Sequence, residues 1–169
     1  MPPTTSQTSS NGIRIRHSFQ PGDTGRLIGL HGLLYAREYG WDHTFEAYVA
    51  QPLAEFVLKH GSREKIWLVD YNGVLMGSIA IVKHSDTEAQ LRWFLLHPSI
   101  WGRGLGSQLV RDAIDFCGEV GYKHVFLWTV SSLTAAARIY TNAGFHLSEE
   151  NTHTIWGCVL TEQRYDLLL

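Results

Sequence analysis

The sequence predicts a mixed α/β fold, in which a mostly antiparallel sheet contains one parallel pair of strands and carries helices on both faces. Two observations predict it. Residues 65–96 read as three short strands joined by tight turns, and Asn72-Gly73 between the first two is a strong hairpin signal. Residues 93–130 read as strand, glycine-rich loop, helix and apolar strand, an order that joins parallel strands through a right-handed crossover.

The composition is that of a globular protein without strongly charged partners. Of the 169 residues, 44% are hydrophobic and 18% are charged, and the formal net charge is −2. Nucleic acids and anionic membranes call for clustered Lys and Arg, which the sequence lacks, so we expect neither partner. No apolar run approaches the length of a membrane span, and no basic leader precedes one. We expect a cytoplasmic protein, in which Cys117 and Cys158 are reduced thiols within a helix and a strand.

The domain boundaries follow from the first residues. Residues 1–11 contain Pro, Thr, Ser and Gln and almost nothing to bury, so we expect a disordered tail. Residues 12–169 are expected to form a single domain, because this length is typical of one domain. The domain opens with residues 13–19, whose period-two alternation predicts a half-buried strand.

Two helical patterns follow this strand. Asp23 is placed to cap the first helix, which Gly40 ends, and Asp42 to cap the second. Pro52 should kink or restart the second helix, because proline lacks the N–H that would bond to Tyr48. The residues that mark the first helical stripe are Leu27, Leu30, Leu33 and Leu34, and those expected to face inward in the second are Phe45, Val49, Phe56 and Val57.

The last third of the chain adds a strand, a helix and a hairpin. Residues 123–130 form the apolar strand that follows the loop's helix. Ser131 or Ser132 should cap the next helix, which ends at Gly144. Residues 145–148 and 155–168 are expected to form a closing hairpin, interrupted at residues 149–151.

The glycine-rich loop carries the clearest functional signal. Gly102, Gly104 and Gly106 alternate at a predicted helix start, where backbone N–H groups can converge and the helix dipole favours an anion. The expected guest is a phosphate or pyrophosphate, and a simple tight turn is the alternative. No Gly-Lys-Ser/Thr follows, which excludes a P-loop. The position beyond mid-chain argues against a Rossmann dinucleotide site.

Two motifs and the order of elements give the chain a resemblance to a known family. The loop at residues 102–106 and Tyr140 with residues 143–145 (Ala-Gly-Phe) resemble the signatures of the GNAT superfamily of acetyl-CoA-dependent N-acetyltransferases. The resemblance covers nearly all of the chain after the tail. It is strongest to the acetyltransferase half of proteins fused to MarR-type regulators, although we expect no regulator half here. Trp101 and Leu133 depart from the family, which usually has Gln or Arg and Asn at these positions.

The resemblance implies that the parallel strands splay around acyl-CoA and that acetyl-CoA is the cofactor. It also implies that Tyr140 donates a proton to the departing thiolate, whereas periodicity alone would make Tyr140 a core aromatic. The implied cofactor contacts are backbone groups of Leu95, His97, Gly102, Arg103, Gly104, Leu105, Gly106 and Ser107.

The acceptor side of the reaction gives weaker signals. An attacking amine must be neutral although its pKa is about 10.4, so a base or a water chain to one is expected. Glu88 is the first candidate base, and the others are Glu149, Asp70, His84 and His97, each of which is also an ordinary surface or loop residue. A candidate lip for a cationic amine consists of Glu38, Trp41, Asp42 and Glu46, with helix capping and solvation as the alternative for the acids.

The predicted function is transfer of an acetyl group from acetyl-CoA to a primary amine by direct attack. The acceptor is expected to be a small molecule or a lysine side chain. A module that binds acyl-CoA without catalysis, or that partners a regulator, is the alternative. We expect no metal, because the nine histidines show no zinc-ligand spacing. A homodimer is compatible with this function.

Overall fold

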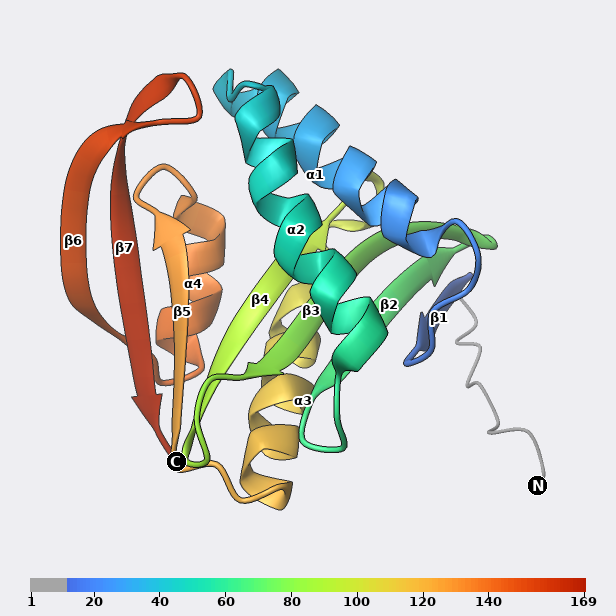
Figure 1. The fold of residues 1–169 in the computed structure, drawn as a ribbon, viewed down its shortest axis with the longest axis vertical. Coiled ribbons are helices and arrows are strands. Elements are labelled where there is room, and N and C mark those ends of the chain that lie inside the picture. Colours follow the sequence, from blue (N-terminus) through green and yellow to red (C-terminus); the bar gives the residue numbers. More distant parts are fainter. Residues whose placement is uncertain (1–11) are drawn as a thin grey trace.

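The computed structural model describes residues 12–169, and the predicted disordered tail, residues 1–11, lies outside the described residues. One seven-stranded sheet has the order β1-β2-β3-β4-β5-β7-β6, and among the described strands only β4 and β5 pair in parallel (Figure 1). The strands are β1 (Ile13–Arg16), β2 (Lys65–Tyr71), β3 (Val74–Lys83), β4 (Glu88–Leu96), β5 (His124–Val130), β6 (His146–Ile155) and β7 (Cys158–Leu168). The helices are α1 (Asp23–Tyr39), α2 (His43–Lys59), α3 (Leu105–Glu119) and α4 (Thr134–Asn142), with the short 3-10 helix η1 (Pro98–Ile100). The predicted fold class is confirmed.

The sheet is covered on both faces and therefore has two cores. Helices α1 and α2 pack on one face, and α3 and α4 on the other (Figure 1). In β2, Leu68 belongs to the core under α1 and α2, while the next residue, Val69, belongs to the core under α3. Both side chains are fully buried, as the pleat requires for a strand covered on two sides.

The predicted hairpins are confirmed, and one boundary is corrected. Asn72 and Gly73 both have positive φ, 49° and 82°, as a type I′ turn demands. Trp156 and Gly157 repeat this geometry with φ of 52° and 77° and join β6 to β7. The expected interruption at residues 149–151 is wrong, because these residues lie inside β6. Strand β6 is largely exposed, so its polar residues do not break the strand.

Three helix boundaries differ from the sequence prediction. Pro52 does not restart α2, which runs unbroken from His43 to Lys59. Because Pro52 has no N–H, the carbonyl of Tyr48 loses its partner within the helix. Tyr48 lies on the exposed side of α2, where water can bond to this carbonyl. The α4 helix begins at Thr134 with no side-chain cap, so neither Ser131 nor Ser132 caps it. Asp23 does not cap α1 and is instead buried.

Leu33 of the predicted stripe is 75% exposed. The predicted Asp42 cap is confirmed, since this carboxylate accepts from the amide of Thr44 at 2.9 Å.

The strands β4 and β5 remain paired over only three positions. Glu88, Ala89 and Gln90 pair with residues 124–126, and no further pair follows along the described strands. Beyond this point β4 also carries a bulge. Arg92 pairs with Ala80 and Leu95 with Ser78, so β4 has one residue more than β3 between these two pairs. Trp93, inside the bulge, has a φ of 48°. The two strands thus diverge toward their carboxyl ends.

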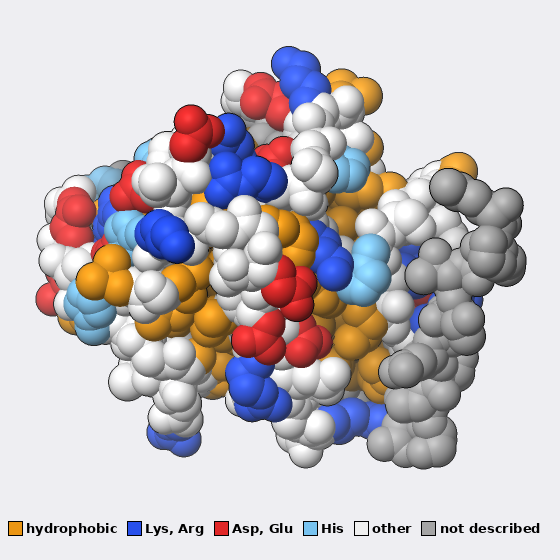
Figure 2. All heavy atoms as spheres, turned by 90° about the horizontal axis from the view of Figure 1, so that it is seen from below, with side chains coloured by type: hydrophobic (Ala, Val, Ile, Leu, Met, Phe, Trp, Pro, Cys, Tyr) orange, Lys and Arg blue, Asp and Glu red, His pale blue; other side chains and the backbone are white. Residues whose placement is uncertain are grey.

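Basic and acidic side chains are mixed on the face of the protein seen from below in Figure 1's view. On the face seen in Figure 2, Lys and Arg side chains are interspersed with Asp and Glu, and no continuous basic patch forms. Along residues 12–169 the structure contains no helix that has both the length and the hydropathy to cross a bilayer. Cys117 and Cys158 are free thiols, and burial raises the pKa of Cys117 to about 12.

A buried ion triad fixes the first strand to the sheet. The Arg16 guanidinium donates to both oxygens of Asp70 at 2.6 and 3.0 Å and to both oxygens of Asp23 at 2.9 and 3.1 Å. These residues come from β1, β2 and the start of α1. All three are less than one-tenth exposed, so removing one of them would leave a buried charge without its partner.

We predict that Arg16→Met lowers the free energy of unfolding by about 3–5 kcal/mol, because it leaves two buried carboxylates without their cation. Arg14→Met is the matched control, since Arg14 is exposed on the same strand and should change the stability by less than about 0.5 kcal/mol. Urea unfolding measures both. Equal midpoints for the two variants would show that the triad contributes nothing.

Candidate active site

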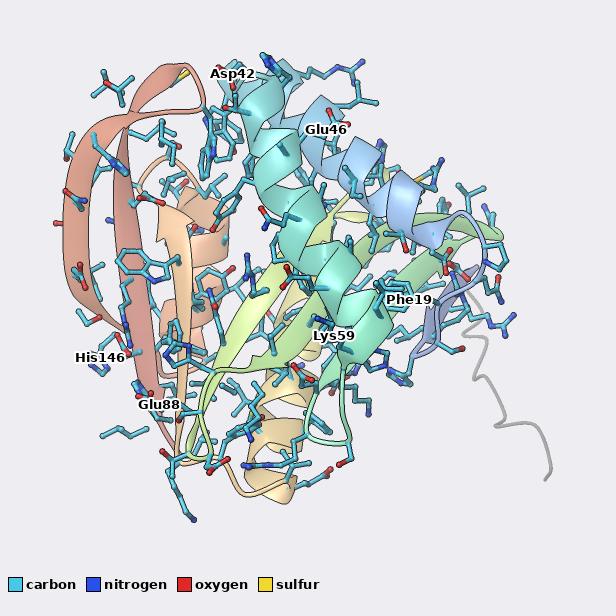
Figure 3. The ribbon with its side chains drawn as sticks, viewed as in Figure 1. Phe19, Asp42, Glu46, Lys59, Glu88 and His146 are labelled. Carbon is cyan, nitrogen blue, oxygen red and sulfur yellow. The ribbon has the colours of Figure 1, made fainter. Side chains whose placement is uncertain are left out.

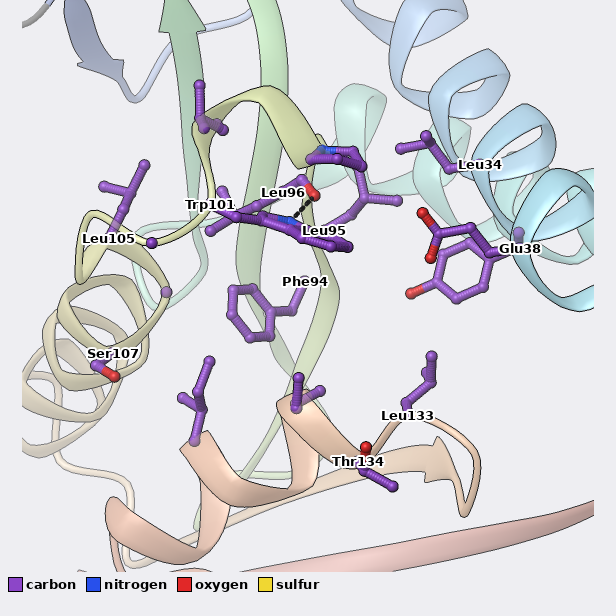
Figure 4. A pocket seen from close by; sticks show the side chains of 18 of the residues that line it. Leu34, Glu38, Phe94, Leu95, Leu96, Trp101, Leu105, Ser107, Leu133 and Thr134 are labelled. Atoms are coloured by element: carbon purple, nitrogen blue, oxygen red, sulfur yellow. Dashed lines mark hydrogen bonds between the residues drawn. The ribbon is translucent and has the colours of Figure 1, made fainter.

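Two cavities meet where β4 and β5 diverge. The larger, about 620 Å³, lies between the end of β4, the glycine-rich loop, the starts of α3 and α4 and the second half of α1 (Figure 4); we call it the loop cavity. The smaller, about 120 Å³, lies between α1, α2, β4, β5 and the turn at Trp156; we call it the α2 cavity. Tyr35, Phe94, Leu133 and Ala136 line both cavities. A reaction between molecules that enter from opposite sides would therefore take place beside these four residues.

The loop has the geometry of an anion site. Gly102 and Gly104 both have φ of 71°, a left-handed conformation that other residues adopt only with strain, and a Cβ at either would meet no atom within 4 Å. The helix α3 starts without a side-chain cap and without an acid in its first turn. The N–H groups of that turn are consequently available to a ligand, and the helix dipole adds positive potential. A pyrophosphate fits this cradle.

The third glycine has a different role. A Cβ at Gly106 would lie 3.0 Å from the Ile139 side chain and 3.3 Å from that of Phe94. Gly106 therefore lets α3 approach α4 and β4 closely, and it shapes the cavity wall in addition to offering its amide.

Trp101 is a residue whose role could not be seen in the sequence. Its indole N–H donates to the carbonyl of Leu96 at 2.7 Å, and the side chain, 56% exposed, forms part of the cavity wall (Figure 4). The carbonyl at the end of β4 is thus already engaged. The sequence shows only an aromatic residue beside the glycines, from which this hydrogen bond cannot be predicted.

Some of the predicted cofactor contacts lie in the cavity and others do not. Leu95, Gly102, Gly104, Leu105, Gly106 and Ser107 all line the loop cavity. His97 does not, because its amide donates to Met76 at 2.8 Å and its carbonyl accepts from Ile100 at 3.0 Å. Arg103 also lies outside, with its guanidinium 5.0 Å from the Tyr71 ring centroid.

Of the predicted acceptor lip, one acid faces a cavity. Glu38 lines the loop cavity, opposite Leu133 of α4 (Figure 4). Trp41 lines the α2 cavity, where it is 4% exposed and stacks on Tyr35 with ring centroids 4.7 Å apart. Asp42 lines neither cavity, because its carboxylate caps α2.

Glu46 also stays away from both cavities. Its carboxylate lies against α1, 2.8 Å from where a Cβ at Gly32 would stand (Figure 3). Capping and solvation, the alternative weighed above for the lip acids, thus describe Asp42, which caps α2, and Glu46, which is exposed.

Glu88, the first candidate base, lies at the start of β4 and lines neither cavity. It is ion-paired to His124 at 2.8 Å, and the other ring nitrogen of His124 lies 2.6 Å from Asp166 (Figure 3). Eight residues separate Glu88 from Leu96, which is about 26 Å at roughly 3.3 Å per residue. The structure does not bring Glu88 to either cavity, and Glu149, Asp70 and His84 line neither of them.

Tyr140 lines the α2 cavity at the junction. Its ring is 5% exposed and packs on Phe94 and Tyr165, with centroids 5.9 and 6.1 Å away. Burial raises the pKa of Tyr140 well above its ordinary value, with smaller contributions from Tyr35 and Tyr165. The hydroxyl therefore stays protonated and can act as a donor. Both readings of Tyr140, core aromatic and donor, agree with this position.

His31 is a second residue that sequence reasoning missed. Its Nδ1 lies 2.8 Å from the carbonyl of Leu27, and because a carbonyl only accepts, Nδ1 carries the proton. Nε2 then offers a lone pair, and it has no partner within the described chain. Burial lowers the pKa of His31 to about 4, so the ring is neutral at pH 7. His31 lines the α2 cavity. The sequence does not single it out, because its four-residue spacing from Leu27 is common to all residues on the buried side of a helix.

Solved structures share this architecture. The chain superimposes on yncA, a putative acetyltransferase from Salmonella typhimurium solved with its cofactor acetyl-CoA, with a TM-score of 0.74, 17% identity and 94% of each chain covered. An acetyltransferase from Streptococcus agalactiae gives a TM-score of 0.70 at 20% identity, over 94% of this chain and 99% of that one. At these identities the likeness establishes the fold.

Sequence comparisons establish the family. The model of the acetyltransferase (GNAT) family matches residues 25–145. An uncharacterized N-acetyltransferase of Schizosaccharomyces pombe is 30% identical over 122 residues, which cover 70% of this chain and 74% of the relative. Because the family model spans more than half of the sequence, the chain belongs to the GNAT family and is an acetyl-CoA-dependent acyltransferase.

Proposed function

We propose that this acyltransferase transfers the acetyl group to a primary amine by direct attack, with the cofactor in the loop cavity and the amine entering from the α2 side. The observation that carries the proposal is the meeting of the two cavities between β4 and β5. One cavity ends at an anion-binding helix start. The other is lined largely by aromatic side chains. Such a junction brings an amine to an acyl group without a covalent enzyme intermediate.

The residues that would hold acetyl-CoA are those of the loop cavity. The amides of Gly104, Leu105, Gly106 and Ser107 would bind the pyrophosphate, and Leu95 at the end of β4 would contact the rest of the cofactor. When bound, the cofactor supplies an acyl group activated as a thioester. The apolar wall made by Phe94, Leu133 and Ala136 keeps water from that group.

Three side chains that line the cavities are carboxylates or imidazoles, which can accept a proton from the amine. Glu38 lies at the loop cavity, and His31 and Glu162 line the α2 cavity. Glu162 is held by His153 at 2.5 Å, and His31 is a weak base because burial disfavours its charged form. We propose that Glu38 attracts the cationic amine and that His31 orients the neutral amine through Nε2.

Tyr140 is proposed to stabilise the departing thiolate. Burial raises its pKa, so complete proton transfer to a thiolate is unfavourable. The hydroxyl acts instead by donating a hydrogen bond to the developing charge on sulfur.

Further proposals concern the setting of the enzyme. The free thiols agree with a cytoplasmic location. The one sheet formed by residues 12–169 agrees with a single catalytic domain. We also propose that this domain forms a homodimer. Within the family, we place the chain nearest to the acetyltransferase halves of MarR-type fusions, on the strength of the residues quoted for that resemblance.

We predict that acetyl-CoA stabilises the folded protein by about 2.7 kcal/mol at roughly 100 times its Kd. Gly104→Asp should abolish this shift in melting temperature, because it places a carboxylate beside the anion site. Gly121→Asp is the matched control, since Gly121 has a φ of 89° and open surroundings at the other end of α3. Both variants should start from a lower melting temperature, but only Gly121→Asp should respond to acetyl-CoA. An unchanged wild-type melting temperature in millimolar acetyl-CoA would contradict the cofactor assignment.

Tyr140→Phe is predicted to lower kcat by about 10²- to 10⁴-fold, with the Kd of acetyl-CoA little changed, because only the hydroxyl is removed. Tyr165→Phe is the control, as this ring packs on Tyr140 but lines neither cavity. Steady-state kinetics compare the two. If Tyr140→Phe retains most of the wild-type kcat, Tyr140 is a core aromatic and nothing more.

Glu38→Gln is predicted to raise the KM for the amine about 10-fold while acetyl-CoA still stabilises the protein, because one charge that attracts the ammonium is lost. Asp42→Asn and Glu46→Gln serve as controls and should leave KM unchanged, since both side chains lie outside the cavities. A KM that responds equally in all three variants would assign the effect to the general negative charge of this end of the protein.

A further inference from the structure

We propose that the amine acceptor carries a carboxylate close to its amino group, as a free α-amino acid does, and that Arg92 binds this carboxylate in the α2 cavity. This inference rests on the proposed function and narrows its substrate class.

Arg92 lines the α2 cavity, at the start of the bulge in β4. Leu91 belongs to the core under α3, so the alternation of the strand turns Arg92 toward α1 and α2. The left-handed backbone at Trp93 turns the next side chain to the same side. The guanidinium lies 5.0 Å from the Trp93 ring centroid and 6.0 Å from that of Tyr48 on α2. Two aromatic faces thus hold the cation at the cavity wall.

The charge of Arg92 lacks a carboxylate partner in the described structure. Arg16 and Arg164, by contrast, each form ion pairs with aspartates. Burial lowers the pKa of Arg92, partly offset by Tyr48, which shows that the site disfavours an uncompensated cation. A half-buried arginine without a counter-ion is suited to an anionic ligand, and its planar fork matches a carboxylate.

Two further donors of the same cavity are also unpartnered. The indole N–H groups of Trp41 and Trp93 are buried and make no hydrogen bond within residues 12–169, and both residues line the α2 cavity. An indole N–H can only donate. Together with Arg92 they form a set of donors that calls for oxygen acceptors. The acceptors of the cavity, His31 and Glu162, are suited to the amino end of the same molecule.

The dimensions favour a carboxylate close to the amine. Arg92 and Phe94, where the cavities meet, are two positions apart on β4, and both line the α2 cavity. A molecule that places its amine at the junction and its carboxylate at Arg92 is therefore a short one. The α2 cavity holds about 120 Å³, roughly the volume of four waters, which also indicates a compact group.

The test compares the twenty common α-amino acids with their decarboxylated amines and their amides as acceptors. We expect the wild-type enzyme to acetylate its best amino acid with a kcat/KM about 10- to 100-fold above both analogues. Arg92→Met should reduce that ratio to near one, mainly through the KM of the amino acid, and Arg92→Lys should retain part of it. Arg63→Met is the matched control, because Arg63 stacks on Tyr122 at 4.2 Å outside both cavities and should leave the ratio unchanged.

A binding measurement separates this inference from the proposed function. With free CoA present, amino acids should raise the melting temperature of the wild type, their decarboxylated amines should not, and Arg92→Met should lose the effect. Equal kcat/KM for amino acids and decarboxylated amines would overturn the role of Arg92 and leave acetyl transfer intact. If no amine is acetylated, the proposed function fails, and the melting temperatures alone decide whether Arg92 binds a carboxylate. Stabilisation by amino acids that is lost in Arg92→Met supports the carboxylate site. No stabilisation of the wild type by amino acids overturns it.

Discussion

The loss of pairing between β4 and β5 after Gln90 is the constraint on which the rest of the structure depends. Each strand keeps its outer partner, since β4 stays paired to β3 as far as Leu96 and β5 to β7 as far as Val130. Only the facing edges separate. Their backbone groups then require another partner, and an extended ligand rich in amides can provide it.

The closed end of this split is held by a charged network. Glu88 of β4, His124 of β5 and Asp166 of β7 are joined side by side at the positions where the parallel strands still pair. Burial alone would raise the pKa of Asp166, but hydrogen bonds from Arg164, Ser148 and His124 lower it to about 2. The Asp166 carboxylate therefore stays ionised at neutral pH. Glu88 thus has a clear structural position: it fixes the point from which the strands diverge.

The open end separates two regions that favour negative charge. On one side the glycine-rich loop presents the amides at the start of α3, and on the other Arg92 lies over Trp93. Between them stand Phe94, Leu133 and Ala136, which are apolar and line both cavities. Anionic groups on either side would position two molecules, and this apolar centre would strengthen the hydrogen bond that we propose for Tyr140.

Features that depend on neighbours in sequence could be predicted, and features that depend on distant residues could not. The turn at Asn72 and Gly73 and the glycines of the loop follow from backbone conformation, and the parallel pair follows from the handedness of crossovers. The partner of Glu88 comes from β5, and the cavity that His31 and Arg92 line is formed by several elements that are distant in the sequence, so no local pattern shows what these residues contact. The bulge that turns Trp93 inward is likewise invisible before β3 and β4 are placed together.

Amide hydrogen exchange with and without acetyl-CoA tests most directly whether the cofactor lies between the diverging strands. We expect slower exchange in residues 91–96 and 127–130 and in the loop at residues 102–107, with little change at residues 88–90, where the strands already pair. Protection confined to other parts of the molecule, with none along the two separated edges, would contradict the assignment of the split as the active site.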